Sequence, residues 1–439
     1  MKNLLLFLII FMLLFPAIEK TFNITEERAL KGVSFPTTRE PLNFTNWKSG
    51  VFQQHYVLCF DDKIGYKPTL VRLFNQIDFS LFDKPGQDYI VAGKSGYLFT
   101  KDNLDAYTGK DKLSHSELKK KIGYVYQVQK YLENKGIHFL FVFASSKARI
   151  YPEFFPSRYS GKKKGLSNYE EYLKIIKEEY PDLHVLDMNA YFLQLKNKVN
   201  FPVYPKGGVH WTKYTGNKYF IDTLLGYMGE MQHKRFQRIR ERNFHWSSKL
   251  EEPDDDIRQT MNLCFQQTNT KLPYADFYFL KEPAANKPRL LVIADSYYSM
   301  IYKFSSYNDL FSKTNFWYYN KTRFPEEYYN KTTDPVFLRD DLLNHDFVVV
   351  MATEVNLNDL FLFPESAASW LGIGNAETMK KIAHKQERIQ FFINQMRNTP
   401  EWLRKLKQNA KQTNRTLEAV LLDDAEFLEK LEEQNNRMK

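Results

Sequence analysis

Two short segments of the chain carry residue types that could form a nucleophilic site. An apolar run, Arg289 to Ala294, leads straight into Asp295 and Ser296, and His210 stands in a glycine-rich stretch followed by Trp and Thr. A serine hydroxyl needs a base to become a nucleophile, and histidine is the usual base. Taken singly, Asp295 and Ser296 could merely cap a helix, and His210 could be a hydrogen-bonded loop residue.

Alternating strands and helices are expected to position these segments. A Gly-Lys-Ser-Gly turn between residues 89–92 and 97–99 predicts a hairpin. A helix is expected to begin at Ser114, with Glu117 completing a capping box, and to end at Gly136. Further apolar runs predict buried strands at residues 137–143, 183–186, 289–294 and 347–352. The pattern indicates an α/β fold, a mostly parallel sheet with helices on both faces, whose functional groups follow the carboxyl ends of the strands.

The chain divides into four expected parts. Residues 1–20 are a signal anchor or signal peptide, and 21–88 are a stalk with a first helical segment, partly helical from Asn46 towards Phe74 and interrupted at Pro68. Residues 89–370 form the α/β domain. Residues 371–439 carry helical apolar stripes and no strand pattern, which predicts a C-terminal helical tail with two helices separated at Pro400.

The N-terminus indicates export. Lys2 is followed by an apolar run from Leu4 to Ala17. The run is shorter than the roughly 20 residues of a typical spanning helix, which favours a signal peptide. Against this, no small-x-small cleavage site is evident, and Ile18-Glu19-Lys20 follows. An uncleaved anchor is therefore slightly favoured, and in either case most of the chain is expected outside the cytoplasm.

Net charge and sequence motifs limit the classes of molecule that the protein is expected to bind. The net charge of +10 is compatible with nucleic acid, an anionic membrane surface or an acidic polymer. No zinc-finger, RNA-binding or helix-turn-helix signature is present, so nucleic acid is not expected. The basic run 233–242 is interpreted as a solvated helix face. The cysteines, Cys59 and Cys264, lack metal-ligand spacing but could pair in an exported protein.

Six stretches occur in an order that resembles a known family. They are Lys67, Arg72 and Asn75 before QIDFSLF; AGKSGYLF at residues 92–99; SKARIYP at residues 146–152; GVHW at residues 208–211; ADS at residues 294–296; and Thr353-Glu354. Over roughly residues 45–365 the chain resembles the SGNH-hydrolase-like family that includes the alginate O-acetyltransferases AlgJ and AlgX. In that family a D-x-H-W motif precedes a GDS motif, the reverse of ordinary SGNH esterases.

The resemblance implies a circularly permuted SGNH-type α/β domain, membrane-anchored on the periplasmic side. It implies acetyl transfer to a polysaccharide hydroxyl, with a membrane-bound O-acyltransferase supplying the acetyl group. Ser296 would be the nucleophile and His210 the base, with Asp295 also in the catalytic motif. Neither a metal nor another cofactor is implied. The residues expected to bind substrate are Lys147, Trp211, Tyr297 and Glu354.

Three departures from the family pattern bear on the mechanism. Gly208 stands where the family has the acid of D-x-H, Ala294 replaces the glycine of GDS, and Ser146 stands near a frequent proline. Without an acid His210 lacks the group that fixes its tautomer. A backbone carbonyl or Glu354 is favoured as the substitute over Asp187. Two other functions remain open: a polysaccharide esterase or deacetylase, and a polysaccharide-binding component without catalysis.

Overall fold

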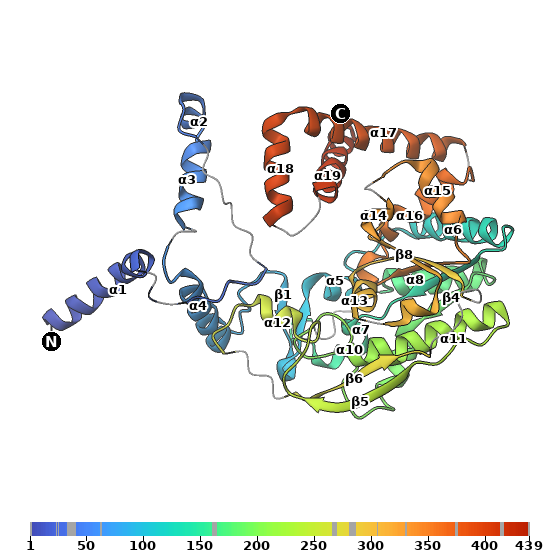
Figure 1. Cartoon of the computed structure of the whole chain (residues 1–439), viewed down its shortest axis with the longest axis horizontal. Coiled ribbons are helices and arrows are strands. Elements are labelled where there is room, and N and C mark those ends of the chain that lie inside the picture. Colours follow the sequence, from blue (N-terminus) through green and yellow to red (C-terminus); the bar gives the residue numbers. More distant parts are fainter. Residues whose placement is uncertain are drawn as a thin grey trace.

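The computed structural model describes residues 2–437 of the chain except residues 23, 25, 33–40, 62–63, 160–164, 266–269, 281–286, 305, 330–331, 374–375 and 413–416. Its centre is a six-stranded sheet with the order β4-β3-β10-β7-β8-β9 (Figure 1). All neighbours pair in parallel except β8 and β9. The predicted mostly parallel sheet is thus confirmed. Its strands are β3 (His138–Phe143), β4 (Val185–Asp187), β7 (Arg289–Ala294), β8 (Lys313–Tyr318), β9 (Thr322–Phe324) and β10 (Phe347–Ala352).

Helices cover both faces of this sheet, because the side chains of each strand alternate between two cores. In β10, Val348 and Val350 pack into one core, and Val349 and Met351 pack into the other. The first core is closed by α6 (His115–Glu133), α8 (Asn168–Glu179), α15 (Pro335–Leu343) and α16 (Phe363–Trp370). The second is closed by α9 (Met188–Leu195), α11 (Ile221–Gln232) and α13 (Ser296–Phe304).

Shorter elements shape the edge where the parallel strands end. The predicted hairpin is present, and its turn includes Gly96 at φ +77°, a conformation that glycine adopts without strain. Ser114 and Glu117 form the predicted capping box. The elements are β1 (Ile90–Ala92), β2 (Leu98–Thr100), α5 (Lys101–Thr108), α7 (Lys147–Ile150), α10 (Lys213–Thr215), a π-helical turn (Gly216–Phe220), α12 (Asp256–Thr260) and α14 (Glu326–Tyr329).

The basic run 233–242 is not a helix face, which corrects the sequence interpretation. Helix α11 ends at Gln232 and is capped by His233, whose backbone is left-handed at φ +51°. The end of the run enters β5 (Arg240–Ser247), which pairs antiparallel with β6 (Leu272–Tyr278). Side chains of β5 are almost all exposed. The charges at the end of the run are therefore solvated, as expected, but on a separate two-stranded sheet.

Helices flank the α/β core at both ends of the chain. Pro68 lies in the first turn of α4, where proline is tolerated, and the break predicted there falls just before that helix. Pro400 separates two tail helices as predicted. Cys59 is buried and Cys264 exposed, and both are free. These flanking helices are α1 (Lys2–Phe22), α2 (Phe44–Lys48), α3 (Val51–Asp61), α4 (Lys67–Phe82), α17 (Ala376–Asn398), α18 (Pro400–Gln412) and α19 (Leu417–Arg437).

Candidate active site

The two predicted motifs meet at the carboxyl edge of the sheet. Strand β7 ends at Ala294, and Ser296 opens α13, so the serine lies where a strand passes into a helix. His210 lies in the loop before α10. Its Nε2 is 3.0 Å from Ser296 Oγ although the residues are 86 positions apart in sequence. The expected contact between nucleophile and base is therefore present in the structure.

Asp256 forms a triad with His210 and Ser296. Its Oδ2 lies 2.6 Å from His210 Nδ1, and its Oδ1 accepts hydrogen bonds from the main-chain N–H groups of Val209 and Ile257 at 2.8 and 2.7 Å. The carboxylate is thus fixed by the main chain on one side and by the imidazole on the other. This geometry holds the Nδ1 proton toward Asp256 and leaves Nε2 free to accept the serine proton.

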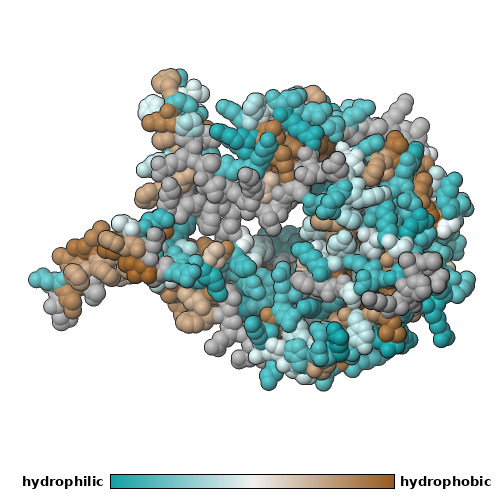
Figure 2. Space-filling view, in the orientation of Figure 1, coloured by the Kyte–Doolittle hydropathy of each residue, from teal (hydrophilic) through white to brown (hydrophobic). Residues whose placement is uncertain are grey.

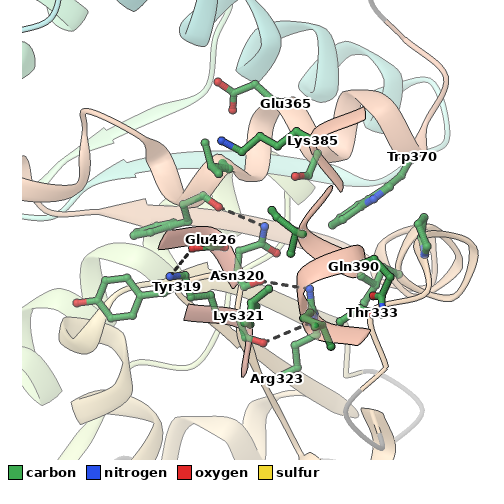
Figure 3. Close-up of a pocket in the computed structure, with 18 of the residues that line it drawn as sticks. Tyr319, Asn320, Lys321, Arg323, Thr333, Glu365, Trp370, Lys385, Gln390 and Glu426 are labelled. Carbon is green, nitrogen blue, oxygen red and sulfur yellow. Dashed lines mark hydrogen bonds and ion pairs between the residues drawn. The ribbon is translucent and has the colours of Figure 1, made fainter. Parts of the chain in front are cut away.

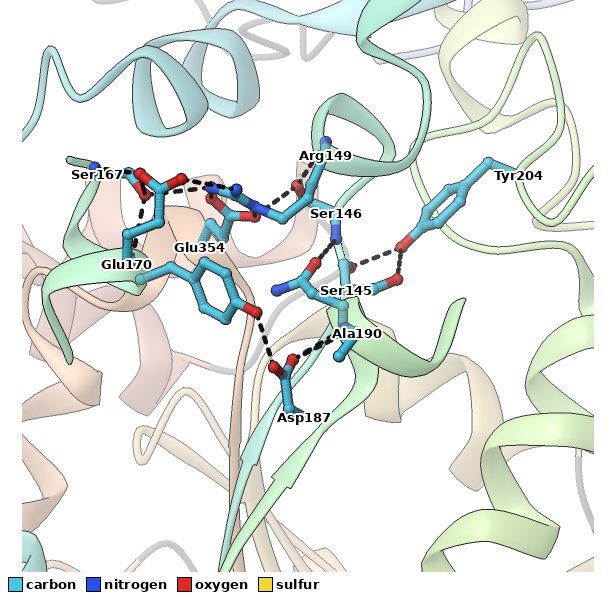
Figure 4. Close-up of polar contacts among 11 residues, drawn as sticks. Ser145, Ser146, Arg149, Ser167, Glu170, Asp187, Ala190, Tyr204 and Glu354 are labelled. Carbon is cyan, nitrogen blue, oxygen red and sulfur yellow. Dashed lines mark hydrogen bonds and ion pairs between the residues drawn. The ribbon is translucent and has the colours of Figure 1, made fainter. Parts of the chain in front are cut away.

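The acids proposed from the sequence are engaged elsewhere, which corrects that prediction (Figure 4). Glu354 is buried and accepts two hydrogen bonds from the guanidinium of Arg149, at 2.5 and 2.7 Å. Asp187 caps α9 and accepts the hydroxyl hydrogen of Tyr169 at 2.8 Å. A backbone carbonyl is not the partner of Nδ1 either, because Asp256 occupies that position.

Gly208 explains why the acid comes from another segment. A Cβ atom at this position would lie 2.8 Å from a Pro205 side-chain carbon and 2.9 Å from the Pro253 carbonyl oxygen. The turn that carries Asp256 is therefore packed directly against the glycine. An aspartate at position 208 has no room there, so Gly208→Asp is not expected to restore a family-like triad.

Asp295 holds the end of β7 against β10. Its Oδ2 accepts hydrogen bonds from the main chain and hydroxyl of Thr353 and from Asn356, and its Oδ1 accepts from the N–H of Tyr297. The carboxylate is directed at these groups rather than at His210. Asp295 therefore acts on the nucleophile through the backbone, as a positioning residue.

Lys147 is almost fully buried beside the His210 loop, and its expected role in substrate binding stays a prediction. Its buried Nζ donates to the carbonyl oxygens of Leu98, Lys206 and Gly208 at 2.7, 2.8 and 2.7 Å. Burial lowers the pKa of Lys147 well below its usual range, but satisfying all three oxygens requires the three donors of the ammonium form. The side chain thus ties the β1–β2 hairpin to the His210 loop.

Trp211 and Tyr297 form the wall behind the imidazole. The ring of Tyr297 lies 4.7 Å from that of His210, and its hydroxyl donates to the carbonyl of Val209 at 2.7 Å. Trp211 packs edge-on against Tyr297 at 4.9 Å. Both side chains are almost fully buried. Tyr297 packs against the imidazole of His210, and the expected roles of Trp211, Tyr297 and Glu354 in substrate binding stay predictions.

Tyr319 is a site residue that the sequence analysis did not identify. It follows β8, next to β7 in the sheet, and its backbone is left-handed at φ +50°. Burial raises the pKa of its hydroxyl above the usual range, and hydrogen bonds with the side chain and main chain of Ser296 oppose that rise. The phenol therefore lies directly beside the nucleophile.

A cavity of about 540 Å³ adjoins this position (Figure 3). It lies between the turn after β8, helix α16 and the tail helices α17 and α19, and Tyr319 stands at its edge. Arg323 and Trp370 line it together with apolar side chains. Tyr319 thus borders both the serine and a space large enough for a small-molecule group.

The acidic turn that carries Asp256 gives a pH-dependent prediction. Burial raises the pKa of Asp254 to about 7, against about 4 in an unfolded chain. Between these values the folded state holds the extra proton, so this group lowers the free energy of unfolding as pH rises. In Asp254→Asn the contribution disappears. The stability of wild type minus that of the variant should therefore fall between about pH 4 and pH 7 in denaturant titrations, and a constant difference would contradict this assignment.

The fold and the triad define a class: an α/β protein with a serine nucleophile suited to hydrolysis or transfer of an acyl group. Residues 90–246 match the family described as "SGNH hydrolase-like domain, acetyltransferase AlgX". The resemblance seen in the sequence is thereby confirmed: over this part, the chain is similar to an SGNH hydrolase-like domain of that type. The matched residues include His210 but end before Asp256 and Ser296, whose roles rest on the geometry.

The chain is also similar to three solved structures. The O-acetyltransferase domain of Pseudomonas putida AlgJ is 15% identical, with 61% of this chain and 92% of that chain covered and a TM-score of 0.40. Bacillus cereus PatB1 is 14% identical, with 63% and 99% covered and a TM-score of 0.42. Pseudomonas aeruginosa AlgX is 15% identical, with 65% and 70% covered and a TM-score of 0.39. No curated protein sequence matches the chain.

Proposed function

We propose that the protein transfers acetyl groups to hydroxyls of a cell-surface or exported polysaccharide through an acetyl-serine at Ser296. The observation that carries the proposal is His210 placed between Asp256 and Ser296, at 2.6 and 3.0 Å, in a chain with an AlgX-type domain. The carboxylate of Asp256 removes the main argument for a binding protein without catalysis, which was the absence of an acid at Gly208.

The reaction has two half-steps that use the same residues. In the first, Ser296 Oγ attacks the acetyl carbonyl of a donor ester while His210 Nε2 takes the hydroxyl proton. The tetrahedral intermediate collapses, and His210 returns the proton to the departing donor oxygen. In the second, a sugar hydroxyl attacks the acetyl-serine, His210 takes its proton, and Ser296 leaves as the free hydroxyl. Asp256 stabilises the imidazolium in both half-steps.

The oxygen that becomes negative in each intermediate needs hydrogen-bond donors. The N–H of Ser296 is at the start of α13, and the hydroxyl of Tyr319 lies beside the same residue. We assign these groups to the oxyanion. Their contribution is electrostatic, because the donors are fixed before charge develops.

Tyr319→Phe should therefore reduce kcat/KM for acetyl transfer on the order of 10²-fold while the protein remains folded. The phenylalanine keeps the ring and removes only the hydroxyl. Tyr328→Phe is the matched control, since the Tyr328 hydroxyl donates to Asp341 rather than to Ser296. Steady-state kinetics with an acetyl ester measures both variants. Equal rates for Tyr319→Phe and wild type would exclude the phenol from the oxyanion site.

Transfer and hydrolysis use the same catalytic residues, so the acceptor must be tested directly. The purified chain would be incubated with an acetyl ester, with and without a polysaccharide, and acetyl recovered on sugar would be measured against free acetate. Transfer predicts acetylated sugar and less acetate when the acceptor is present. Acetate alone, at a rate independent of the polysaccharide, would identify an esterase instead.

We further propose that the protein acts outside the cytoplasm, anchored by α1, and receives acetyl groups from a membrane-bound O-acyltransferase. Among the described residues, Asn3–Phe22 is the one helical stretch long and apolar enough to cross a membrane. If α1 is an uncleaved anchor, N-terminal sequencing of the membrane fraction should begin at or near Met1 and the protein should fractionate with membranes. A sequence that begins after Ile18 would show a cleaved signal peptide.

A further inference from the structure

Helix α4 carries an apolar stripe on the side that faces away from the rest of the molecule. Its members recur at helical spacing, so they share one face. The exposed fractions range from 43% for Leu70 to 70% for Leu81, and a normal surface helix would turn such a stripe inward. The exposed apolar side chains of α4 are Leu70, Leu73, Phe74, Ile77, Leu81 and Phe82.

The opposite face of α4 fixes this orientation with polar contacts. Asn75 is buried and its Nδ2 donates to the carbonyl of Met261 at 2.9 Å. Arg72 is also buried and donates to the carbonyls of Arg28 and Ala29 at 2.5 and 2.9 Å. The polar side of the helix is thus bound to the protein, and the apolar side is exposed.

Helices α2 and α3 extend the same kind of surface. Phe44 and Trp47 of α2 are 75% and 56% exposed. Tyr56, Val57 and Phe60 of α3 are also exposed and recur at helical spacing. Lysine ammonium groups lie at the margins, with Lys48 Nζ 5.9 Å from the Phe44 ring and Lys84 Nζ 5.7 Å from the Phe82 ring. Aromatic and lysine side chains of this kind are typical of a membrane–water interface.

The end of α1 is packed against the start of α4. The main-chain N–H of Tyr66 donates to Glu19 Oε2 at 3.1 Å, and its ring meets that of Phe15 at 5.2 Å. Gly65 is in close contact with the backbone of Pro16. In Figure 1, α1 projects outward from the edge of the molecule along which α3 and α4 run. Figure 2 shows hydrophobic surface over α1 and over parts of this same edge.

We propose that α3 and α4, with α2, lie in the headgroup region of the membrane that α1 spans, as a second and broader lipid contact. The occupant is a lipid surface because the stripe begins where the apolar span ends, so a bilayer around α1 reaches α4 without a break. An interfacial helix buries its apolar face among the headgroups and keeps its polar face in water. In this protein, main-chain carbonyl groups accept hydrogen bonds from the polar face of α4. The contact would hold the Ser296 site at a fixed height above the bilayer.

The inference rests on the membrane anchorage proposed above, so the experiment monitors both. Single cysteines would be introduced into the full chain at Ile77 in α4, at Ile10 in α1 and at Phe244 in β5, in a Cys59→Ala, Cys264→Ser background. Phe244 is the matched control, being 49% exposed where Ile77 is 48% exposed. Each cysteine would carry an environment-sensitive fluorophore, and the protein would be reconstituted into phosphatidylcholine and phosphatidylglycerol vesicles. The lipids would carry no quencher, a spin label near the headgroups to detect position 77, or a spin label deep in the acyl chains to detect position 10.

The proposal predicts strong quenching of the label at position 77 and little at position 244. Labels at Leu70 and Leu81 should behave like that at position 77, which guards against a local effect of one substitution. Quenching at position 10 but not along α4 would leave α1 as an anchor and overturn the interfacial contact. An absence of quenching at every position would overturn the anchorage as well.

The alternative to a lipid surface is a partner protein that covers the apolar stripe of α4. In cells it would protect position 77 from a membrane-impermeant maleimide, while the purified protein in vesicles would show no lipid quenching there. That combination would also overturn the proposal.

Charged side chains on the stripe should weaken the lipid contact. Leu73→Glu with Ile77→Glu should weaken it by about tenfold for each buried side chain replaced, measured as lost quenching at position 70.

Discussion

Alanine in place of Ser296 or His210 should reduce acetyl transfer by about 10⁶-fold in kcat, to the level of reaction without the triad. Ser296→Ala removes the atom that becomes acetylated. His210→Ala removes the base and leaves the hydroxyl protonated. Because the two groups act as a unit, the double variant should be no slower than either single variant. Release of the leaving group from a chromogenic acetyl ester, with product analysis on polysaccharide, measures the loss.

Ser299→Ala is the matched control for the serine. It lies one helical turn along α13, and its replacement should leave the rate within about threefold of wild type because the described partners of the His210 ring nitrogens are Asp256 and Ser296. In cells, polysaccharide acetylation should be lost with Ser296→Ala or His210→Ala and retained with Ser299→Ala. If acetylation were unchanged in both Ser296→Ala and His210→Ala, the protein would not be the enzyme, and a polysaccharide-binding function would be assigned instead.

Asp256→Asn should reduce acetyl transfer by about 10⁴-fold, as loss of the acid does in serine proteases. The asparagine fills the same space, but its amide cannot stabilise the imidazolium and can favour the wrong tautomer of His210. The side chain lies at hydrogen-bonding distance from His210 Nδ1, and thermal unfolding should show that the variant folds.

Asp187→Asn separates this prediction from the acid suggested by the sequence. Asp187 caps α9 and bonds Tyr169, so its replacement should lower stability modestly and leave the rate within about threefold of wild type. A large loss of rate with Asp187→Asn and a small one with Asp256→Asn would reverse the assignment made here.

The sequence predicted the nucleophile and base but not the acid, and the reason is physical. Ser296 follows a long buried strand, and the position after such a strand is fixed by hydrophobic patterning alone. Asp256 lies in a turn with Asp254 and Asp255 next to it. Only tertiary packing decides which of the three reaches His210, since Asp254 is buried against Tyr274 and Asp255 pairs with Arg258.

The sequence pattern also could not predict which polar side chains are buried, or with which groups they interact. Lys147 looked suited to substrate, yet its ammonium is enclosed by carbonyl oxygens of loops far apart in sequence. Glu354 follows a predicted strand, as a site residue should, and is bound by Arg149. Tyr319 was missed because β8 and β9 were not predicted: polar residues such as Asn315 in β8 and Arg323 in β9 interrupt their apolar pattern. Strands with continuous apolar runs, such as β7 and β10, were predicted correctly.

The most direct test of the central claim is to look for the acetyl group on Ser296. The full chain would be mixed with an acetyl ester, quenched in acid at short times, digested and analysed by mass spectrometry, with Ser296→Ala in parallel. The account predicts one added acetyl group on the peptide that contains Ser296, formed before steady turnover and removed when polysaccharide is added. Turnover of the ester without any acetylated Ser296, or with acetylation unaffected by the polysaccharide, would contradict transfer through an acetyl-serine.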